Sequence, residues 1–170
     1  MTPQAAGAIA AGAVVAGGTG VDAYMLATSS AHPTTLEEYL NQKGLQEDNK
    51  TKYTTTGKLG SEVSNQKLLV ADVEVNMDWW NKRYADMKEQ GNSSVKLRDA
   101  ESQEFKAVTK GYGTTNDDST KALNRVCDSV YQKNKTDFTG DTGETRTKAN
   151  LKADVEKFCT LKGEGNLKVD

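Results

Sequence analysis

The most regular pattern of apolar positions runs from Ser61 to Gln90. Apolar residues recur there at spacings of seven, three, four, three, four and three. This is the a/d spacing of a heptad, which is typical of a helix that buries one narrow stripe. Ser61 would cap the start of this helix and Gly91 would end it. The pattern predicts one long central helix with a stripe made of Val63, Val70, Val73, Met77, Trp80, Tyr84 and Met87.

Two later segments also predict amphipathic helices. The first follows Asp117 or Asp118, either of which would cap it, and its apolar residues fall at i, i+3, i+4, i+7 and i+8. The second has its apolar residues on one face and stops by Gly163. The two apolar faces comprise Leu123, Val126, Cys127, Val130 and Tyr131, and then Leu151, Val155, Phe158 and Cys159.

Weaker signals mark two more helices. Thr35 and Glu38 have the spacing of a capping box, which predicts a short helix that ends at Gly44. A ragged apolar stripe predicts a further helix over residues 94–110.

The intervening segments 47–60 and 134–146 are rich in Thr and Gly, which indicates loops. The chain is therefore expected to be all-α, with a small bundle of four to five helices over residues 32–170. We favour packing within this bundle over an intermolecular coiled coil, because the other amphipathic segments need a partner for their apolar faces.

The N-terminal residues 1–31 differ from the rest of the chain. The run from Ala5 to Ala27 is apolar and small, with Asp22 near one end. As a helix it would span about 35 Å, enough to cross a hydrocarbon core of about 30 Å. We expect a single transmembrane helix that contacts the membrane through Ala5 to Ala27. The alternatives are a signal peptide, since Ser29, Ser30 and Ala31 place small residues where a peptidase cleaves, and a soluble tail.

The charge of the remaining chain is almost balanced. Residues 32–170 carry 22 basic and 23 acidic groups. Such a surface has no electrostatic footprint for nucleic acid, so a nucleic-acid partner is not expected. No residue pattern indicates a cofactor or a small-molecule substrate.

A metal site and a catalytic site are also not expected. With His32 as the only histidine, multi-histidine metal sites are excluded. The acidic loop from Asp137 to Glu144 fails as an EF-hand, since Thr142 takes the place of the glycine and Lys148 that of the bidentate glutamate. No nucleophile has an evident base, so an enzyme is the least favoured class.

Cys127 and Cys159 are the only cysteines, and both occupy apolar faces of predicted helices. Outside the cell, such positions on packed neighbours would favour a disulfide between the last two helices. Inside the cell they would be two small buried thiols. The pair is therefore a candidate disulfide whose state depends on the compartment.

Trp79 is a candidate interaction anchor. Trp79 and Trp80 are adjacent, and Trp80 occupies a d position of the stripe. The two rings cannot both face the same seam, because neighbours in a helix point about 100° apart. Trp79 would therefore cover a second helix, stack on Arg83 one turn later, or stand exposed as a contact for a partner.

The N-terminus resembles a known group of proteins. The stretch from Met1 to Gly20, MTPQAAGAIAAGAVVAGGTG, together with Tyr24, Met25 and Leu26, is similar to the start of the paralogous short proteins of haemotropic mycoplasmas. The resemblance implies an uncleaved anchor and a membrane-associated protein that is displayed at the surface and antigenically variable. It supplies no catalytic residues.

Two functions are therefore carried forward. We expect a cell-membrane, single-pass protein whose helical domain lies outside the cell and has an interaction or antigenic role, with a host or self partner. The alternative is an intracellular, membrane-tethered helical adaptor.

Overall fold

The computed structural model describes residues 32–89, 96–140 and 146–170, and this part of the chain is helical. The all-α prediction is confirmed. No described helix is long and apolar enough to cross a bilayer, and the predicted span Ala5–Ala27 lies outside the described residues. The α-helices are α1 (Leu36–Leu40), α2 (Glu47–Thr54), α3 (Val63–Gln66), α4 (Met77–Met87), α5 (Gln103–Lys106), α6 (Leu123–Tyr131) and α7 (Thr147–Cys159). Four 3-10 turns join them: η1 (Leu59–Ser61), η2 (Glu74–Asn76), η3 (Asn116–Asp118) and η4 (Lys135–Phe138).

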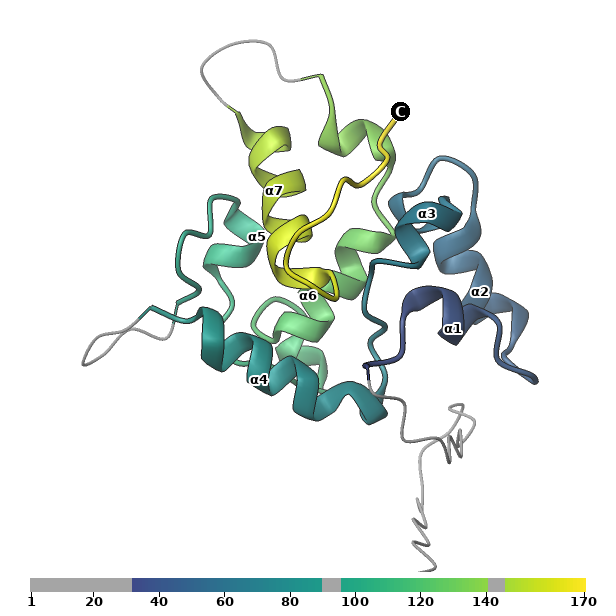
Figure 1. Cartoon of the computed structure of the whole chain (residues 1–170), viewed down its shortest axis with the longest axis horizontal. Helices are drawn as coiled ribbons and strands as arrows, with labels where there is room; N and C mark the ends of the chain where they lie inside the picture. The colour runs from purple at the N-terminus through teal and green to yellow at the C-terminus, as the bar shows by residue number, and fades with distance from the viewer. Residues whose placement is uncertain (1–31, 90–95, 141–145) are drawn as a thin grey trace, which may run out of the picture.

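Helices α6 and α7 form the centre of the domain, with α4 and α5 on one side and α1 to α3 on the other (Figure 1). The predicted apolar faces of both central helices are buried. Phe158 of α7 stacks on Phe105 of α5 with 5.4 Å between ring centroids, which attaches the short α5 to this centre. The capping box of α1 is also confirmed, because the Glu38 amide donates to the Thr35 hydroxyl and the Glu38 carboxylate accepts from the Thr35 amide.

The single long helix predicted over residues 61–90 is wrong. Helix α3 stops at Gln66, and the next helical residues are those of η2 and α4. Two heptad positions lie outside the core, since Val63 is 58% exposed and Met77 is 41% exposed. By contrast, the consecutive residues Leu69, Val70 and Ala71 are all buried. A helix turns by about 100° per residue, so it cannot bury three successive side chains against one neighbour, whereas an extended segment enclosed on all sides can.

The extended segment 68–71 is held by backbone hydrogen bonds to two other parts of the chain. On one side it pairs with residues at the start of α1, and on the other with residues at the end of α7 and just after it. These four bonds satisfy backbone groups that burial would otherwise leave without partners. They run from Leu36 N to Leu69 O (2.8 Å), Ala71 N to Thr34 O (3.1 Å), Val70 N to Cys159 O (3.0 Å) and Leu161 N to Leu68 O (2.9 Å).

Two other predicted segments are also corrected. Residues 47–54 form α2 rather than a loop, and Glu47 and Asp48 in its first turn suit the positive end of the helix dipole. The predicted helix 94–110 shrinks to α5 among the described residues. The Asp154 carboxylate of α7 accepts from the amides of Glu101 and Ser102, and so caps the chain just before α5.

The corrected geometry predicts different costs for two valines that the heptad would treat alike. Val70→Ala should lower the free energy of unfolding by about 2–3 kcal/mol, because Val70 is fully buried. Val63→Ala should cost less than about 0.5 kcal/mol, because Val63 is mostly exposed. Urea unfolding of both variants with the disulfide intact measures the difference. Equal losses of unfolding free energy in the two variants would contradict this geometry and would support the continuous heptad helix.

Candidate functional site on helix α6

Helix α6 joins α7 through a disulfide between Cys127 and Cys159. Both residues are fully buried, and their Cα atoms are 5.7 Å apart, within the ordinary range for a bridge. The predicted disulfide is therefore present in the structure. It links the middle of α6 to the last residue of α7, at the point where Val70 pairs with the Cys159 carbonyl.

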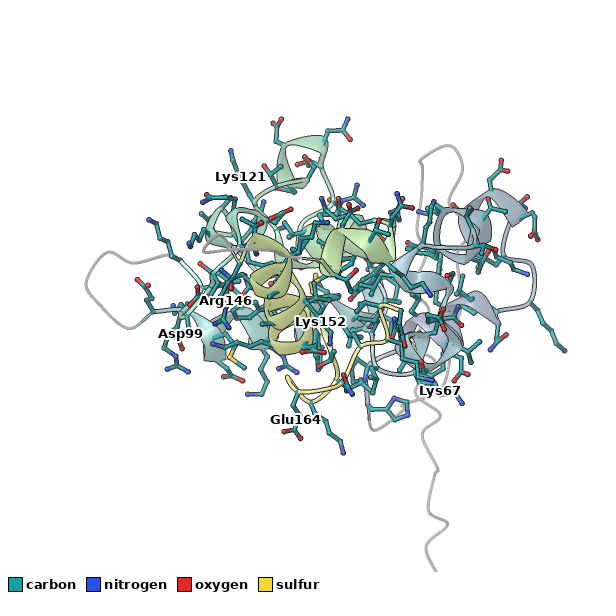
Figure 2. The ribbon with its side chains drawn as sticks, turned by 90° about the horizontal axis from the view of Figure 1, so that it is seen from above. Lys67, Asp99, Lys121, Arg146, Lys152 and Glu164 are labelled. Atoms are coloured by element: carbon teal, nitrogen blue, oxygen red, sulfur yellow. A yellow bond between two sulfur atoms is a disulfide. The ribbon has the colours of Figure 1, made fainter. Side chains whose placement is uncertain are left out.

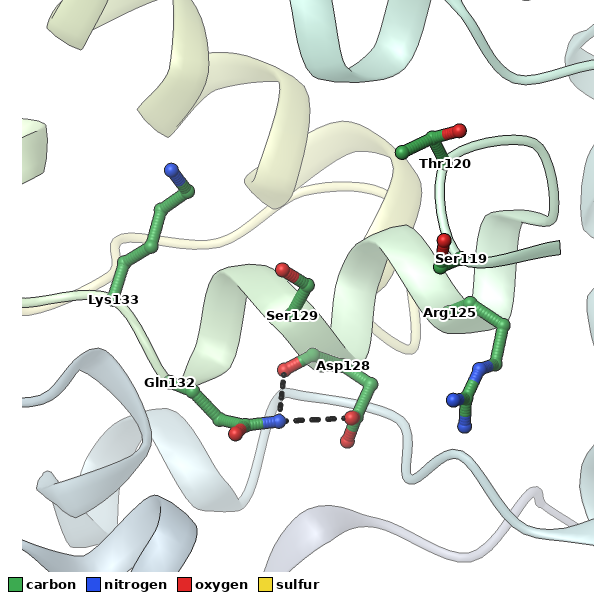
Figure 3. Close-up of a pocket in the computed structure, with 7 residues that line it drawn as sticks. All are labelled: Ser119, Thr120, Arg125, Asp128, Ser129, Gln132 and Lys133. Carbon is green, nitrogen blue, oxygen red and sulfur yellow. Dashed lines mark hydrogen bonds between the residues drawn. The ribbon is translucent and has the colours of Figure 1, made fainter. Parts of the chain in front are cut away.

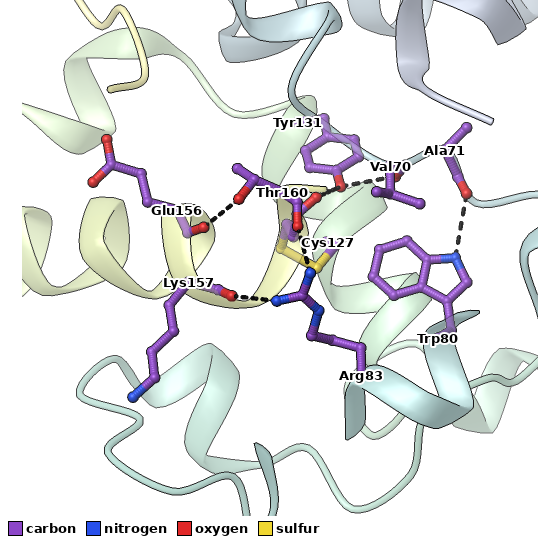
Figure 4. Close-up of a disulfide and its surroundings, with 10 residues drawn as sticks. Val70, Ala71, Trp80, Arg83, Cys127, Tyr131, Glu156, Lys157 and Thr160 are labelled. Carbon is purple, nitrogen blue, oxygen red and sulfur yellow. Dashed lines mark hydrogen bonds between the residues drawn. A yellow bond between two sulfur atoms is a disulfide. The ribbon is translucent and has the colours of Figure 1, made fainter. Parts of the chain in front are cut away.

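Polar side chains tie the surroundings of the disulfide together (Figure 4). The Tyr131 hydroxyl donates to the Val70 carbonyl at 2.9 Å, and burial raises the pKa of Tyr131 well above its ordinary value. From α4, Arg83 donates to the carbonyls of Thr160 (2.9 Å) and Leu161 (2.7 Å), which follow α7. Arg83 also donates to the Lys157 carbonyl at 3.4 Å, in the last turn of α7, where carbonyls lack intrahelical partners.

Trp79 holds this arginine in place. The Arg83 guanidinium lies 4.6 Å from the centroid of the Trp79 ring, and Trp80 meets the same ring edge-on. Trp80 is fully buried and donates to the Ala71 carbonyl at 3.2 Å. Of the three roles considered for Trp79, the geometry provides the stack on Arg83. Trp79 is half-buried, and its use as an interaction anchor stays a prediction.

A polar pocket of about 470 Å³ opens beside α6 (Figure 3). Sequence reasoning missed it, because its α6 residues fall on the polar face of an amphipathic helix and look like solvent contacts, while the other lining residues lie just before or after that helix. The lining combines hydroxyls with two cations and one buried carboxylate: Ser119, Thr120, Arg125, Asp128, Ser129, Gln132 and Lys133.

Asp128 is the most deeply placed of these residues, at 9% exposure. Its carboxylate accepts a hydrogen bond from the Tyr53 hydroxyl of α2 and another from Gln132 Nε2 at 2.9 Å. Burial raises the pKa of Asp128, although the Tyr53 bond opposes the shift. Burial and the nearby Asp128 charge together raise the pKa of Tyr53, so Tyr53 remains a donor. Both carboxylate oxygens are thus already engaged.

Arg125 is held at the pocket by Asp72, which lies just after the extended segment. Arg125 Nη1 is 3.0 Å from Asp72 Oδ2, and Asn124 Nδ2 donates to the other carboxylate oxygen at 2.6 Å. The Arg125 Nε atom is buried and has no hydrogen-bond partner within the described residues. Lys133 contacts Glu104 at 3.3 Å. The pocket therefore offers a fixed guanidinium and several hydroxyls, groups that suit a polar or anionic ligand.

The described residues contain no gathering of three or more His, Cys, Asp and Glu side chains that would hold a metal ion. Asp137, from the acidic loop considered as an EF-hand, instead accepts from the Asn134 amide at 3.2 Å and caps η4. Residues 141–145 of that loop lie outside the described part.

Removing the disulfide should destabilise the domain substantially. The bridge closes a loop with a sequence separation of 32. On the chain-entropy model, the double variant Cys127→Ala/Cys159→Ala should lose about 4 kcal/mol of unfolding free energy, through a less constrained unfolded state. Guanidinium unfolding of this variant against the oxidised parent measures the loss. A change below about 1 kcal/mol would show that the bridge is incidental to the fold.

Asp128 should make the domain less stable as pH rises. A carboxyl with a raised pKa in the folded state binds its proton more tightly there than in the unfolded chain. Its contribution to stability is therefore present at low pH and is lost as pH rises from about 4 through the folded pKa. Asp128→Asn should abolish this fall while keeping an oxygen for Tyr53.

The measurement is the urea midpoint between pH 4 and pH 8, read as the difference between parent and variant so that other titrating groups cancel. Asp117→Asn, at an exposed carboxyl on η3, serves as the matched control and should leave the parent profile unchanged. Identical profiles for parent and Asp128→Asn would contradict the assigned direction.

Comparison with known proteins assigns the chain to no family. No protein-family model matches the chain, and no curated protein or solved structure matches it significantly. We therefore infer the function from the chain's own residues.

Proposed function

We propose that the chain is a membrane-tethered binding module whose disulfide-bonded helical domain lies outside the cytoplasm. The observation that carries the proposal is the disulfide at the centre of the core. Disulfides form and persist in oxidising compartments and are rare in reducing cytosol. The bridge between Cys127 and Cys159 joins the two central helices, with Cα atoms 5.7 Å apart.

The start of the domain supports a short tether. The Thr34 carbonyl already accepts from Ala71 in the core, and α1 follows at Leu36. If residues 5–27 span the bilayer, only residues 28–33 connect the membrane to the domain. Six residues reach about 20 Å at full extension. The domain would therefore sit close to the membrane surface, as suits a displayed protein with an interaction or antigenic role.

The pocket on α6 supports binding rather than catalysis. Its carboxylate already accepts from Tyr53 and Gln132, so it is not poised to take a proton from a substrate. Its hydroxyls at Ser119, Thr120 and Ser129 and the guanidinium of Arg125 instead form a polar surface with a fixed charge. A partner that presents acidic or hydroxyl groups would complement that surface.

Lysine labelling on intact cells tests the orientation. Residues 1–42 contain no lysine, so a label on Lys43 or on any later lysine reports on the domain. With a membrane-impermeant amine reagent on intact cells, we expect biotin on exposed lysines such as Lys67 and Lys121. Peptide mass spectrometry locates the label, and a cytosolic marker controls for leakage.

Two results would overturn the proposal. Lysines that are labelled only after lysis would put the domain in the cytoplasm. Free thiols at Cys127 and Cys159 after acid quenching of fresh cells would favour the intracellular adaptor instead.

A further inference from the structure

The chain that follows α7 returns across the domain and ends beside α3 and η4 (Figure 1). Within this tail, Leu167 is 1% exposed and belongs to the hydrophobic core, although no helix contains it. Its neighbours Asn166 and Lys168 are exposed. The tail therefore lies against the core outside any helix, with Leu167 as its buried apolar anchor and Val169 partly buried beside the core.

Asn65 recognises the backbone of this segment. Its carboxamide oxygen accepts from the Lys168 amide at 2.8 Å, and its Nδ2 donates to the Lys168 carbonyl at 2.9 Å. The second Nδ2 hydrogen is used by the Leu59 carbonyl at 3.0 Å, which fixes the carboxamide in place. Asn65 is fully buried. The two contacts resemble one hydrogen-bonded pair of a β-ladder. Asn65 therefore binds the backbone of the tail at Lys168 and not the Lys168 side chain.

Two more side chains of the domain also hold the tail. The Glu156 carboxylate of α7 accepts from the Leu167 amide at 2.8 Å. The Lys135 ammonium of η4 donates to the Asp170 carbonyl at 2.5 Å and is itself paired with Glu62 at 2.6 Å. All three recognition groups thus belong to the folded body, and none comes from the tail itself.

The connection between α7 and the anchored segment is held at its start, where the Gly163 amide donates to the Thr160 carbonyl at 3.3 Å and the Gly163 backbone lies against Arg83, and has fewer contacts after it. Residues 164–166 are exposed. The Thr160 hydroxyl has one proton to donate and lies 2.6 Å from the Glu156 carbonyl but 3.2 Å from the Glu164 carbonyl, so it favours the helix over the connection. Gly163 has a φ of 73°, which glycine adopts without strain. A well-anchored segment on a connection with fewer contacts is the arrangement of an exchangeable arm.

We propose that residues 167–170 form such an arm, and that the site formed by Asn65, Lys135 and Glu156 accepts the arm of a second copy of this chain. The identical hydrogen bonds and the same Leu167 socket would form between copies as within one. Leu161 is paired with Leu68, so residues 162–166 provide the reach, about 17 Å at full extension. Reciprocal exchange gives a closed two-fold dimer. The proposal stands apart from the membrane tether.

Cross-linking between two tagged full-length chains tests the exchange. One chain carries Thr136→Cys, an exposed position next to Lys135, and the other carries Asp170→Cys at the exposed end of the arm. The native cysteines are bonded to each other and do not react. The two chains are co-expressed, purified in detergent and treated with a short bismaleimide. We expect a cross-linked species that carries both tags.

Two controls separate exchange from collision. Lys121→Cys replaces Thr136→Cys in the first, because Lys121 is exposed and lies at the opposite edge of the domain from Glu164 (Figure 2). In the second, Leu167→Ala is added to the arm and should lower the yield of the two-tag species several-fold, with an intact disulfide confirming that the variant has folded.

The contrary result is equally clear. A chain that carries both Thr136→Cys and Asp170→Cys reports contact within one molecule. If that chain cross-links only within itself, and the co-expressed single variants give no more product than the Lys121→Cys pair, the arm is a strap within one chain. That result would overturn the exchange without bearing on the cellular location of the domain.

Discussion

The rest of the domain depends on the burial of one extended segment in a helical protein. Residues 68–71 run through the core, where every backbone amide and carbonyl needs a partner. One edge of the segment is satisfied by Thr34 and Leu36 and the other by Cys159 and Leu161. These contacts bring the start of the described chain and the end of α7 to the same place. Helices α1 and α7 therefore take positions that the segment dictates.

The disulfide, Tyr131 and Arg83 all act at the same junction. The bridge holds α6 to the end of α7, and Tyr131 connects α6 to the Val70 carbonyl. Arg83, which stacks on Trp79, binds the carbonyls that leave α7. These contacts fix α6 from its inner side, and its outer side presents Arg125 and Ser129 at the pocket. Exchange of the tail would leave this junction intact, because the part of the chain that moves begins after Leu161.

The sequence predicted those parts whose apolar positions repeat within one helix. Helices α6 and α7 have clean amphipathic faces, and the cysteines lie on those faces, so the helices and their bridge were both foreseeable. The stretch from Val63 to Met87 misled the heptad analysis, because Leu69, Val70 and Ala71 are buried by contacts with distant segments rather than by helical periodicity. Helix α2 was missed because, of its residues, only Tyr53 is buried.

The pocket was hidden for a related reason. Asp128 and Arg125 are adjacent to core positions of α6, but their partners Tyr53 and Asp72 come from 75 and 53 residues away. No local pattern indicates such pairings. Polar residues that are buried, such as Asn65 and Asn124, mark such pairings. Burial is a property of the tertiary structure, so the sequence alone does not show which polar residues these are.

Amide hydrogen exchange tests the role of the extended segment most directly. If segment 68–71 is the centre of the fold, the amides of Leu36, Val70 and Leu161 should exchange only through global unfolding, with the same free energy as urea unfolding gives. The amides of Glu164 to Asn166 should exchange much faster in the same sample. Rapid exchange at Val70 and Leu161 while α6 stays protected would contradict the account, because the segment would then be a peripheral loop.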